Sequence, residues 1–165
     1  IDAEVNLTTE CMVAASKHDG LSVIEVLVNC MIFNNGTHKA FAGDKEVRAE
    51  HTITLRQGEK MLFGKNMDKG LMLDNMKLKV VTVGENGVTL DDILVHDAHE
   101  KDTMVHVMLA SMKYPDFPVA LGIIRDVAEP TYEREVARQI AEVQATAKIK
   151  NVDDLLNSGE TWEVE

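Results

Sequence analysis

The apolar run over residues 21–28, LSVIEVLV, is the feature that most restricts the fold of this chain. The run is rich in β-branched residues, and a charge interrupts it only at Glu25. Such a composition is typical of a β-strand that is buried on both faces, as the strands of parallel sheets are. We therefore expect a buried strand over residues 21–28.

A helix is expected directly before this strand. Asn6 is a suitable N-cap, and Leu7, Cys11 and Ala14 recur at helical spacing until Asp19-Gly20 ends the pattern. A helix that leads into a buried strand indicates the tail of a parallel α/β unit, so the first forty residues predict the last α-β step of a doubly wound domain. Because the chain begins with Ile1 rather than Met, we expect a piece of a longer protein, a tag-cleaved whole protein being the alternative.

The remaining sequence predicts both strands and helices. Residues 34–50 are polar and contain glycine, which favours a long loop. The segments 51–55 and 61–64 are expected to form a hairpin around Gly58. Further segments with the composition of strands are 77–83, 89–96 and 119–127, and those with helical character are 100–112, the residues after the Thr131 cap, and a short turn after residue 151.

Charge and cysteine content exclude several classes of partner. The 28 acidic residues outnumber the 17 basic ones, for a net charge of -11, which argues against a nucleic-acid partner because phosphates require a cationic face. No run approaches the roughly 18 apolar residues that a membrane helix needs. Two cysteines are too few for a disulfide framework, so we expect a reducing, cytoplasmic setting.

Histidines offer one candidate site. His96, Asp97 and His99 lie within four residues and His106 follows, a grouping that could hold zinc. A third ligand at a convincing spacing is missing, and a polar connection between strand and helix is the favoured interpretation. The role of His96, His99 and His106 therefore stays open at this point.

Motifs for phosphate-bearing cofactors are missing. Asn34-Asn35 matches the end of a thiamine diphosphate motif, but no Gly-Asp-Gly lies about 25 residues upstream, and the nearest imitation, His18-Asp19-Gly20, is too close. The pair is therefore expected to form a turn. The glycines stand singly, which also excludes Walker and Rossmann phosphate loops.

Cys30 is the remaining candidate. A cysteine at the end of a buried strand is usually a small apolar core residue. However, ligands gather at the carboxyl ends of parallel strands, where a thiolate could act as a nucleophile or as a metal ligand. A nucleophile would lack a base nearby in sequence, although His38 follows eight residues on, and a cluster ligand would lack the usual Cys-x-x-C companions. Cys11 lies on the apolar face of the expected helix and is expected in the core.

Several segments, taken in order, resemble one family, the beta subunits of 2-oxoacid:ferredoxin oxidoreductases, and most closely the C-terminal half of the 2-oxoglutarate type. The resemblance spans essentially the whole chain and rests on the run from Asn29-Cys30 to Gly36, then Leu94 to Asp97, Pro115 to Asp126, Pro130 to Tyr132, and Thr161-Trp162. One departure is Asn35, where family members often have Asp.

The resemblance implies a fold and an activity. The fold class would be α/β, with residues 1–42 ending a doubly wound thiamine diphosphate-binding domain and residues 43–165 forming a C-terminal α+β extension with a mixed sheet. The enzymes of this family decarboxylate a 2-oxoacid, such as 2-oxoglutarate, to an acyl-CoA in central carbon metabolism, and pass electrons to ferredoxin. Their cofactors are thiamine diphosphate, magnesium and a [4Fe-4S] cluster.

The resemblance also assigns a role to Cys30. The fourth cysteine ligand of the cluster maps onto it, whereas the other three ligands and the diphosphate motif belong to the half that this sequence lacks. We therefore expect Cys30 as a metal ligand, the alpha subunit as a partner, and no activity for the chain alone. The alternative is a non-catalytic interaction or assembly domain with Cys30 in core packing.

Overall fold

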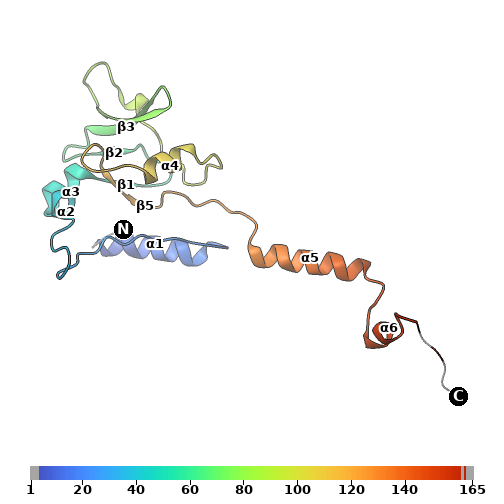
Figure 1. Ribbon diagram of the computed structural model, residues 1–165. Coiled ribbons are helices and arrows are strands. Elements are labelled where there is room, and N and C mark those ends of the chain that lie inside the picture. The colour runs from blue at the N-terminus through green and yellow to red at the C-terminus, as the bar shows by residue number, and fades with distance from the viewer. Residues whose placement is uncertain (1–3, 161, 163–165) are drawn as a thin grey trace. The chain divides into compact units, whose positions relative to one another are not determined.

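The computed structural model describes residues 4–160 and 162, and it shows a mixed α/β chain with one parallel and one antiparallel sheet (Figure 1). This confirms the expected fold class. The chain divides into two compact units, one of residues 1–18 and 22–128 and the other of residues 19–21 and 129–165. The expected domain boundary after residue 42 stays a prediction.

The first unit contains most of the regular structure. Its elements are α1 (Val5–Lys17), α2 (Lys39–Ala42), α3 (Lys45–His51), β1 (Thr52–Leu55), β2 (Leu62–Phe63), β3 (Lys69–Asp74), β4 (Lys77–Thr82), the short 3-10 helix η1 (Leu90–Asp92), α4 (Met104–Ala110) and β5 (Val119–Gly122).

The parallel sheet consists of β1 and β5, which the chain brings together from distant positions. Ile53 pairs with Ala120, and Leu55 pairs with Gly122. The expected hairpin between 51–55 and 61–64 is wrong, because β1 pairs with β5 while β2 pairs with β3. Gly122 has a φ of 102°, and a Cβ there would lie 2.6 Å from the carbonyl oxygen of Leu55, so only glycine fits.

The antiparallel sheet has the order β2-β3-β4. A two-residue turn at Asn75 and Met76, both with positive φ, joins β3 to β4. This conformation suits the right-handed twist of the strands that it connects. The sheet contributes Phe63 and Leu71 to a core that also holds Ile53 and Leu109, each no more than 5% exposed.

Helix α1 packs on the parallel sheet. Its residues Leu7 and Cys11 are buried against Leu121 of β5, with Leu27 at the edge of the cluster. The expected helix and the buried position of Cys11 are confirmed, but the N-cap residue is Glu4 rather than Asn6.

Three other expectations are wrong. Residues 21–29 are extended but join no strand ladder in the described chain, and Val23 is 85% exposed. Residues 34–50 are not one loop, because Asp44 caps α3 by accepting hydrogen bonds from the backbone N–H groups of Glu46 and Val47. The segment 89–96 forms η1 and a single bridge between Val95 and Lys60 instead of a strand.

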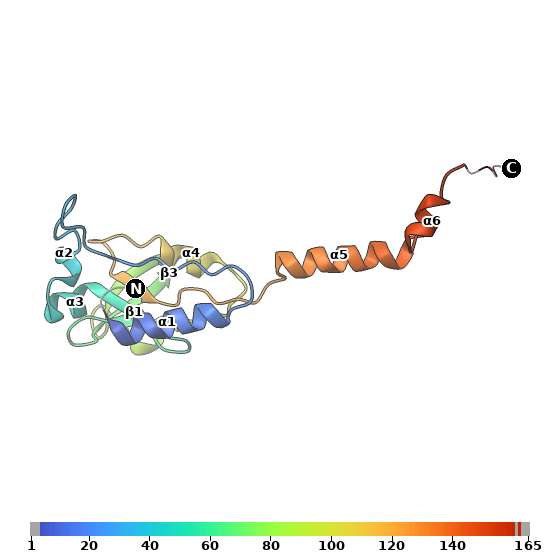
Figure 2. The same ribbon diagram turned by 90° about the horizontal axis from the view of Figure 1, so that it is seen from below.

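The second unit contains α5 (Tyr132–Thr146) and α6 (Val152–Leu156), seen from another side in Figure 2. The hydroxyl of Thr131 accepts a hydrogen bond from the backbone N–H of Arg134, so the predicted cap is confirmed. Neither helix has a buried residue, and Trp162 is 83% exposed. Thr161 lies outside the described residues.

Candidate functional site: the Cys30 loop and the histidine cluster

Cys30 lies where the extended segment turns back on itself. The backbone N–H of Asn34 donates to the carbonyl oxygen of Cys30 at 3.0 Å, which closes a tight turn. The N–H of Phe33 points at the thiol, with 3.5 Å between its nitrogen and Sγ. The sulfur is therefore held beside backbone donors, and Cys30 belongs to neither of the two core clusters.

Asn29 braces this turn from inside. Its Oδ1 accepts a hydrogen bond from the backbone N–H of Gly36 at 2.8 Å, and its Nδ2 donates to Oδ1 of Asn35 at 3.1 Å. The Nδ2 of Asn34 donates to the hydroxyl of Thr37 at 2.8 Å. These side-chain hydrogen bonds link residues across the loop from residue 29 to residue 37.

The backbone donors make the Cys30 thiol more acidic. The pKa of Cys30 lies below its ordinary value because the N–H groups of Phe33 and then Ile32 stabilise the thiolate. Burial has the opposite effect on Cys11, whose pKa is raised. Of the two cysteines, Cys30 is thus the one suited to metal binding or nucleophilic chemistry.

The loop tip next to the thiol is apolar and exposed. Met31, Ile32 and Phe33 are 73%, 85% and 90% exposed. His38, the base considered for a nucleophilic Cys30, instead packs its ring against Phe41, with 5.3 Å between the ring centroids. No interaction in the described part of the chain joins His38 to the thiol, so the geometry does not support a Cys-His pair.

The three candidate histidines lie near the carboxyl end of β5, but each makes its own contacts. Nε2 of His96 donates to the carbonyl oxygen of Ile123 at 2.8 Å. Nε2 of His106 donates to the carbonyl oxygen of Asp97 at 2.8 Å. These bonds assign the protons to Nε2. Nδ1 of His99 lies 2.6 Å from the carbonyl oxygen of Asp126.

The His96 and His106 rings meet edge to face, with 6.4 Å between their centroids. Nδ1 of His106 accepts a hydrogen bond from the guanidinium of Arg125 at 3.0 Å, whereas Nδ1 of His96 is buried without a partner. Burial lowers the pKa of His96, because a charged imidazole would lose its hydration there. Among the described residues, no three His, Cys, Asp or Glu side chains are arranged to hold a metal ion.

Sequence reasoning missed the partners of these histidines. Arg125 and Asp126 are far from them in sequence, and His18 at the end of α1 also reaches Asp126, with 2.9 Å between Nδ1 and Oδ1. Gln57, after β1, donates to the carboxylate of Asp97 at 2.8 Å. No local pattern predicts these contacts, because they depend on the pairing of β1 with β5.

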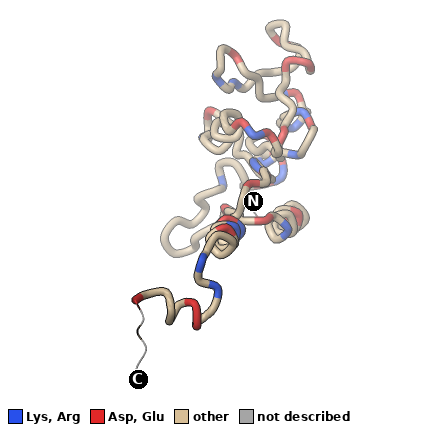
Figure 3. Tube along the Cα trace, turned by 90° about the vertical axis from the view of Figure 1, so that its right-hand side faces the viewer, with Lys and Arg blue, Asp and Glu red and all other residues tan. Residues whose placement is uncertain are grey.

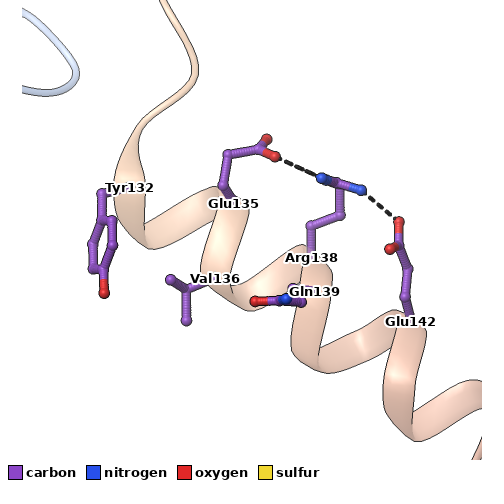
Figure 4. Close-up of a pocket in the computed structure, with 6 residues that line it drawn as sticks. All are labelled: Tyr132, Glu135, Val136, Arg138, Gln139 and Glu142. Atoms are coloured by element: carbon purple, nitrogen blue, oxygen red, sulfur yellow. Dashed lines mark hydrogen bonds and ion pairs between the residues drawn. The ribbon is translucent and has the colours of Figure 1, made fainter.

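A small surface hollow lies on α5 and is lined by that helix alone (Figure 4). Its charged residues are paired with one another, since Arg138 bonds to Glu135 at 2.7 Å and to Glu142 at 2.6 Å. Figure 3 shows Lys and Arg interspersed with Asp and Glu along the chain. Because the hollow is lined by one helix whose charges pair with each other, and because cations and anions are interspersed, we place the candidate site at Cys30.

Comparison with known proteins finds one relative, and it agrees with the resemblance that the sequence motifs indicate. The chain is 30% identical to the 2-oxoglutarate oxidoreductase subunit KorB of Mycobacterium tuberculosis, over an alignment that covers 100% of this chain and 44% of that protein. This match confirms the resemblance stated from the motifs. No family model and no solved structure matches the chain. No described helix has the length and apolarity needed to cross a membrane.

Proposed function

We infer that this chain is part of the beta subunit of a 2-oxoacid oxidoreductase, and we propose that Cys30 supplies one thiolate ligand to an iron–sulfur cluster of that enzyme. Similarity to KorB along the whole chain supports the first statement, and the chain spans less than half of that relative. The observation that carries the second is the Cys30 sulfur itself, which lies where a braced turn begins and beside backbone N–H groups.

The residues present fit one position of such a cluster. A thiolate ligand has to be deprotonated, and the lowered pKa of Cys30 favours that form. Hydrogen bonds from backbone N–H groups to a ligand sulfur are a feature that tunes such clusters. Core packing, the alternative for Cys30 in a non-catalytic assembly domain, is not supported by its place on a loop. Bound there, the cluster would transfer electrons one at a time.

The activity of the whole enzyme follows from the resemblance. We propose that it decarboxylates a 2-oxoacid, with 2-oxoglutarate as first candidate, to an acyl-CoA and delivers the electrons to ferredoxin. Thiamine diphosphate, magnesium and the other three cluster ligands would be held by the rest of the subunit, and the alpha subunit would complete the enzyme. This chain alone would be inactive, since it holds one suitable thiol and no diphosphate motif.

The test compares two cysteine variants of the full-length subunit, each expressed with its partner subunit. Cys30→Ala should abolish most of the iron content and the visible absorbance of the cluster, whereas Cys11→Ala should retain both. Elution volume and far-UV circular dichroism show whether each variant is assembled. An assembled Cys30→Ala protein with the iron content and spectrum of the wild type would disprove the ligand assignment.

A further inference from the structure

Residues 123–126 follow β5 directly and precede the part of the second unit that begins at residue 129; we call them the exit segment. Four of the six histidines of the chain contact this segment. They are His18 at the end of α1, His96 and His99 in the connection before α4, and His106 within α4. A stretch of four residues is thus held by titratable rings from three parts of the first unit.

His106 binds the exit segment through a contact that requires a neutral ring. Its Nε2 donates to the carbonyl oxygen of Asp97, which leaves Nδ1 to accept from the guanidinium of Arg125 at 3.0 Å. Arginine has donors but no acceptor and is always charged, so a proton on Nδ1 would bring two donors and two positive charges together. Arg125 also donates to the carbonyl oxygen of Glu100 at 2.9 Å, which holds its guanidinium in place. Protonation of His106 therefore breaks its contact with the segment.

His96 holds the segment under the same condition. Its Nε2 donates to the carbonyl oxygen of Ile123 at 2.8 Å, and its Nδ1 is buried without a partner. A proton on Nδ1 would create a buried donor with no acceptor, in a residue that is 1% exposed. Asp97, the acidic residue next in the chain, is exposed, and its carboxylate already accepts a hydrogen bond from Gln57. The charged form of His96 therefore does not fit the held state.

The other two histidines oppose this effect only weakly. Nδ1 of His99 donates to the carbonyl oxygen of Asp126 at 2.6 Å, a bond that the ring makes in either charge state. Nδ1 of His18 lies 2.9 Å from Oδ1 of Asp126, and protonation strengthens that pair. The two side chains of the pair are 20% and 36% exposed, so water screens the attraction. The buried rings of His96 and His106 therefore decide how the segment responds to acid.

We propose that the exit segment is a pH-controlled latch, held by the neutral rings of His96 and His106 and released from them in mild acid. Release gives both imidazoles access to water, where their charged forms are hydrated, and it frees the chain that leads to residue 129. Exposed histidine takes up its proton near pH 6.5, so each ring that stays neutral in the held state weakens that state about tenfold between pH 7.5 and 5.5. Two such rings together weaken it about a hundredfold.

Hydrogen exchange of the full-length protein, measured by mass spectrometry at pH 7.5 and 5.5, tests the proposal. A direct probe is the backbone N–H of Asp126, which donates to the carbonyl oxygen of Ala98 at 2.8 Å and so joins the segment to the histidine connection. After correction for the intrinsic effect of pH on exchange, protection over residues 123–128 should fall by about tenfold to a hundredfold at pH 5.5. Equal protection at the two pH values would overturn the proposal.

Urea separates a local release from unfolding of the whole chain. Residues 69–82 contain the paired strands β3 and β4 and report on global unfolding. At pH 5.5, urea below the unfolding transition should hardly accelerate exchange over residues 123–128, because a local opening exposes little surface. It should accelerate exchange over residues 69–82. Parallel acceleration of both segments would show global unfolding instead of release, and would overturn the proposal.

Three histidine variants give an independent readout. His106→Gln keeps a neutral side chain that can donate to Asp97 and accept from Arg125, so the effect of acid should shrink about tenfold. His99→Gln is the matched control and should retain the full effect, since the His99 contact does not depend on charge. His18→Gln removes the pair that protonation strengthens, so the effect of acid should grow.

The variants also set the outcomes that refute the latch. An undiminished effect of acid in a folded His106→Gln protein would do so, as would loss of the effect in His99→Gln. Should His106→Gln fail to fold, His18→Gln decides, because His18 is only partly buried. A smaller effect of acid in His18→Gln than in the wild type would then refute the proposal.

Discussion

The burial of His96 predicts that the folded chain loses stability as the pH falls below about 6.5, the ordinary pKa of histidine. His96 is 1% exposed, its Nδ1 has no partner, and its ring faces that of His106. The nearby Asp97 favours the charged form of His96 only weakly against the effect of burial. The pKa of His96 is therefore depressed in the folded state, and the unfolded chain takes up the proton first.

The sign and size of the change in unfolding free energy with pH follow from this difference in the pKa of His96 between the folded and unfolded states. A depressed histidine pKa contributes its full stability above the unfolded pKa, and that contribution is lost as the pH falls from about 6.5 toward the folded value. The slope approaches about 1.4 kcal/mol per pH unit for one proton. Between pH 6.5 and 5.5 the loss reaches about 1 kcal/mol when the folded state takes up no proton in that interval.

The assay is urea unfolding at pH 6.5 and 5.5, followed by circular dichroism. His96→Gln removes the titrating group, and the glutamine amide can still donate to the carbonyl of Ile123. We expect this variant to be less stable than the wild type at pH 6.5 but to lose about 1 kcal/mol less between the two pH values. Leu109→Ala is the control, since Leu109 is 1% exposed in the core and does not titrate. It should lower stability by about 2–5 kcal/mol at both pH values alike.

The reasoning would be refuted if His96→Gln showed the same pH dependence as the wild type. A smaller pH dependence in Leu109→Ala would also contradict it, because loss of core packing alone would then account for the result. The comparison of slopes cancels the contributions of the other histidines, which both variants retain.

Two further predictions concern the backbone near each site. Gly122→Ala should cost at least about 1–3 kcal/mol in unfolding free energy, because alanine is strained at a φ of 102° and its Cβ would meet the carbonyl oxygen of Leu55; a melting temperature equal to that of the wild type would contradict this. Asn29→Ala removes the acceptor of the Gly36 N–H, a bond worth about 0.5–1.5 kcal/mol, so exchange of that amide should accelerate by a few-fold to roughly tenfold while exchange in the Leu109 core is unchanged. Equal exchange of the Gly36 amide in both proteins would show that Asn29 does not brace the loop.

Helices that are marked by an apolar spacing or by a capping residue could be predicted from the sequence. The spacing of Leu7 and Cys11 predicted α1, and the Thr131 cap with its following periodicity predicted α5. The short helix α3 escaped notice because its apolar pattern is weak, although Asp44 followed by Lys-Glu is a recognisable cap. Strand β3 escaped because its turn is Asn75-Met76 rather than the Asn-Gly that usually marks such a hairpin.

The candidate site divides in the same way. Cys30 and the turn after it could be identified from the sequence, because Asn34-Asn35-Gly36 is a local turn signal. The hydrogen bonds by which the Asn29 side chain braces this loop could not be identified from the sequence, because another asparagine could have made them equally well. The partners of the histidines depend on contacts between residues 9 to 108 positions apart, and no periodicity encodes them.

The sequence by itself determined α1, β4 and α5, that Cys11 is buried, and that the chain resembles part of a larger oxidoreductase subunit. Only the tertiary structure decided which strands pair, because the parallel pairing of β1 with β5 follows from a long crossover rather than from a turn. It also decided the state of residues 22–29, whose sequence is that of a buried strand. A strand is stable only with neighbours to pair with, and within the described chain those neighbours are missing.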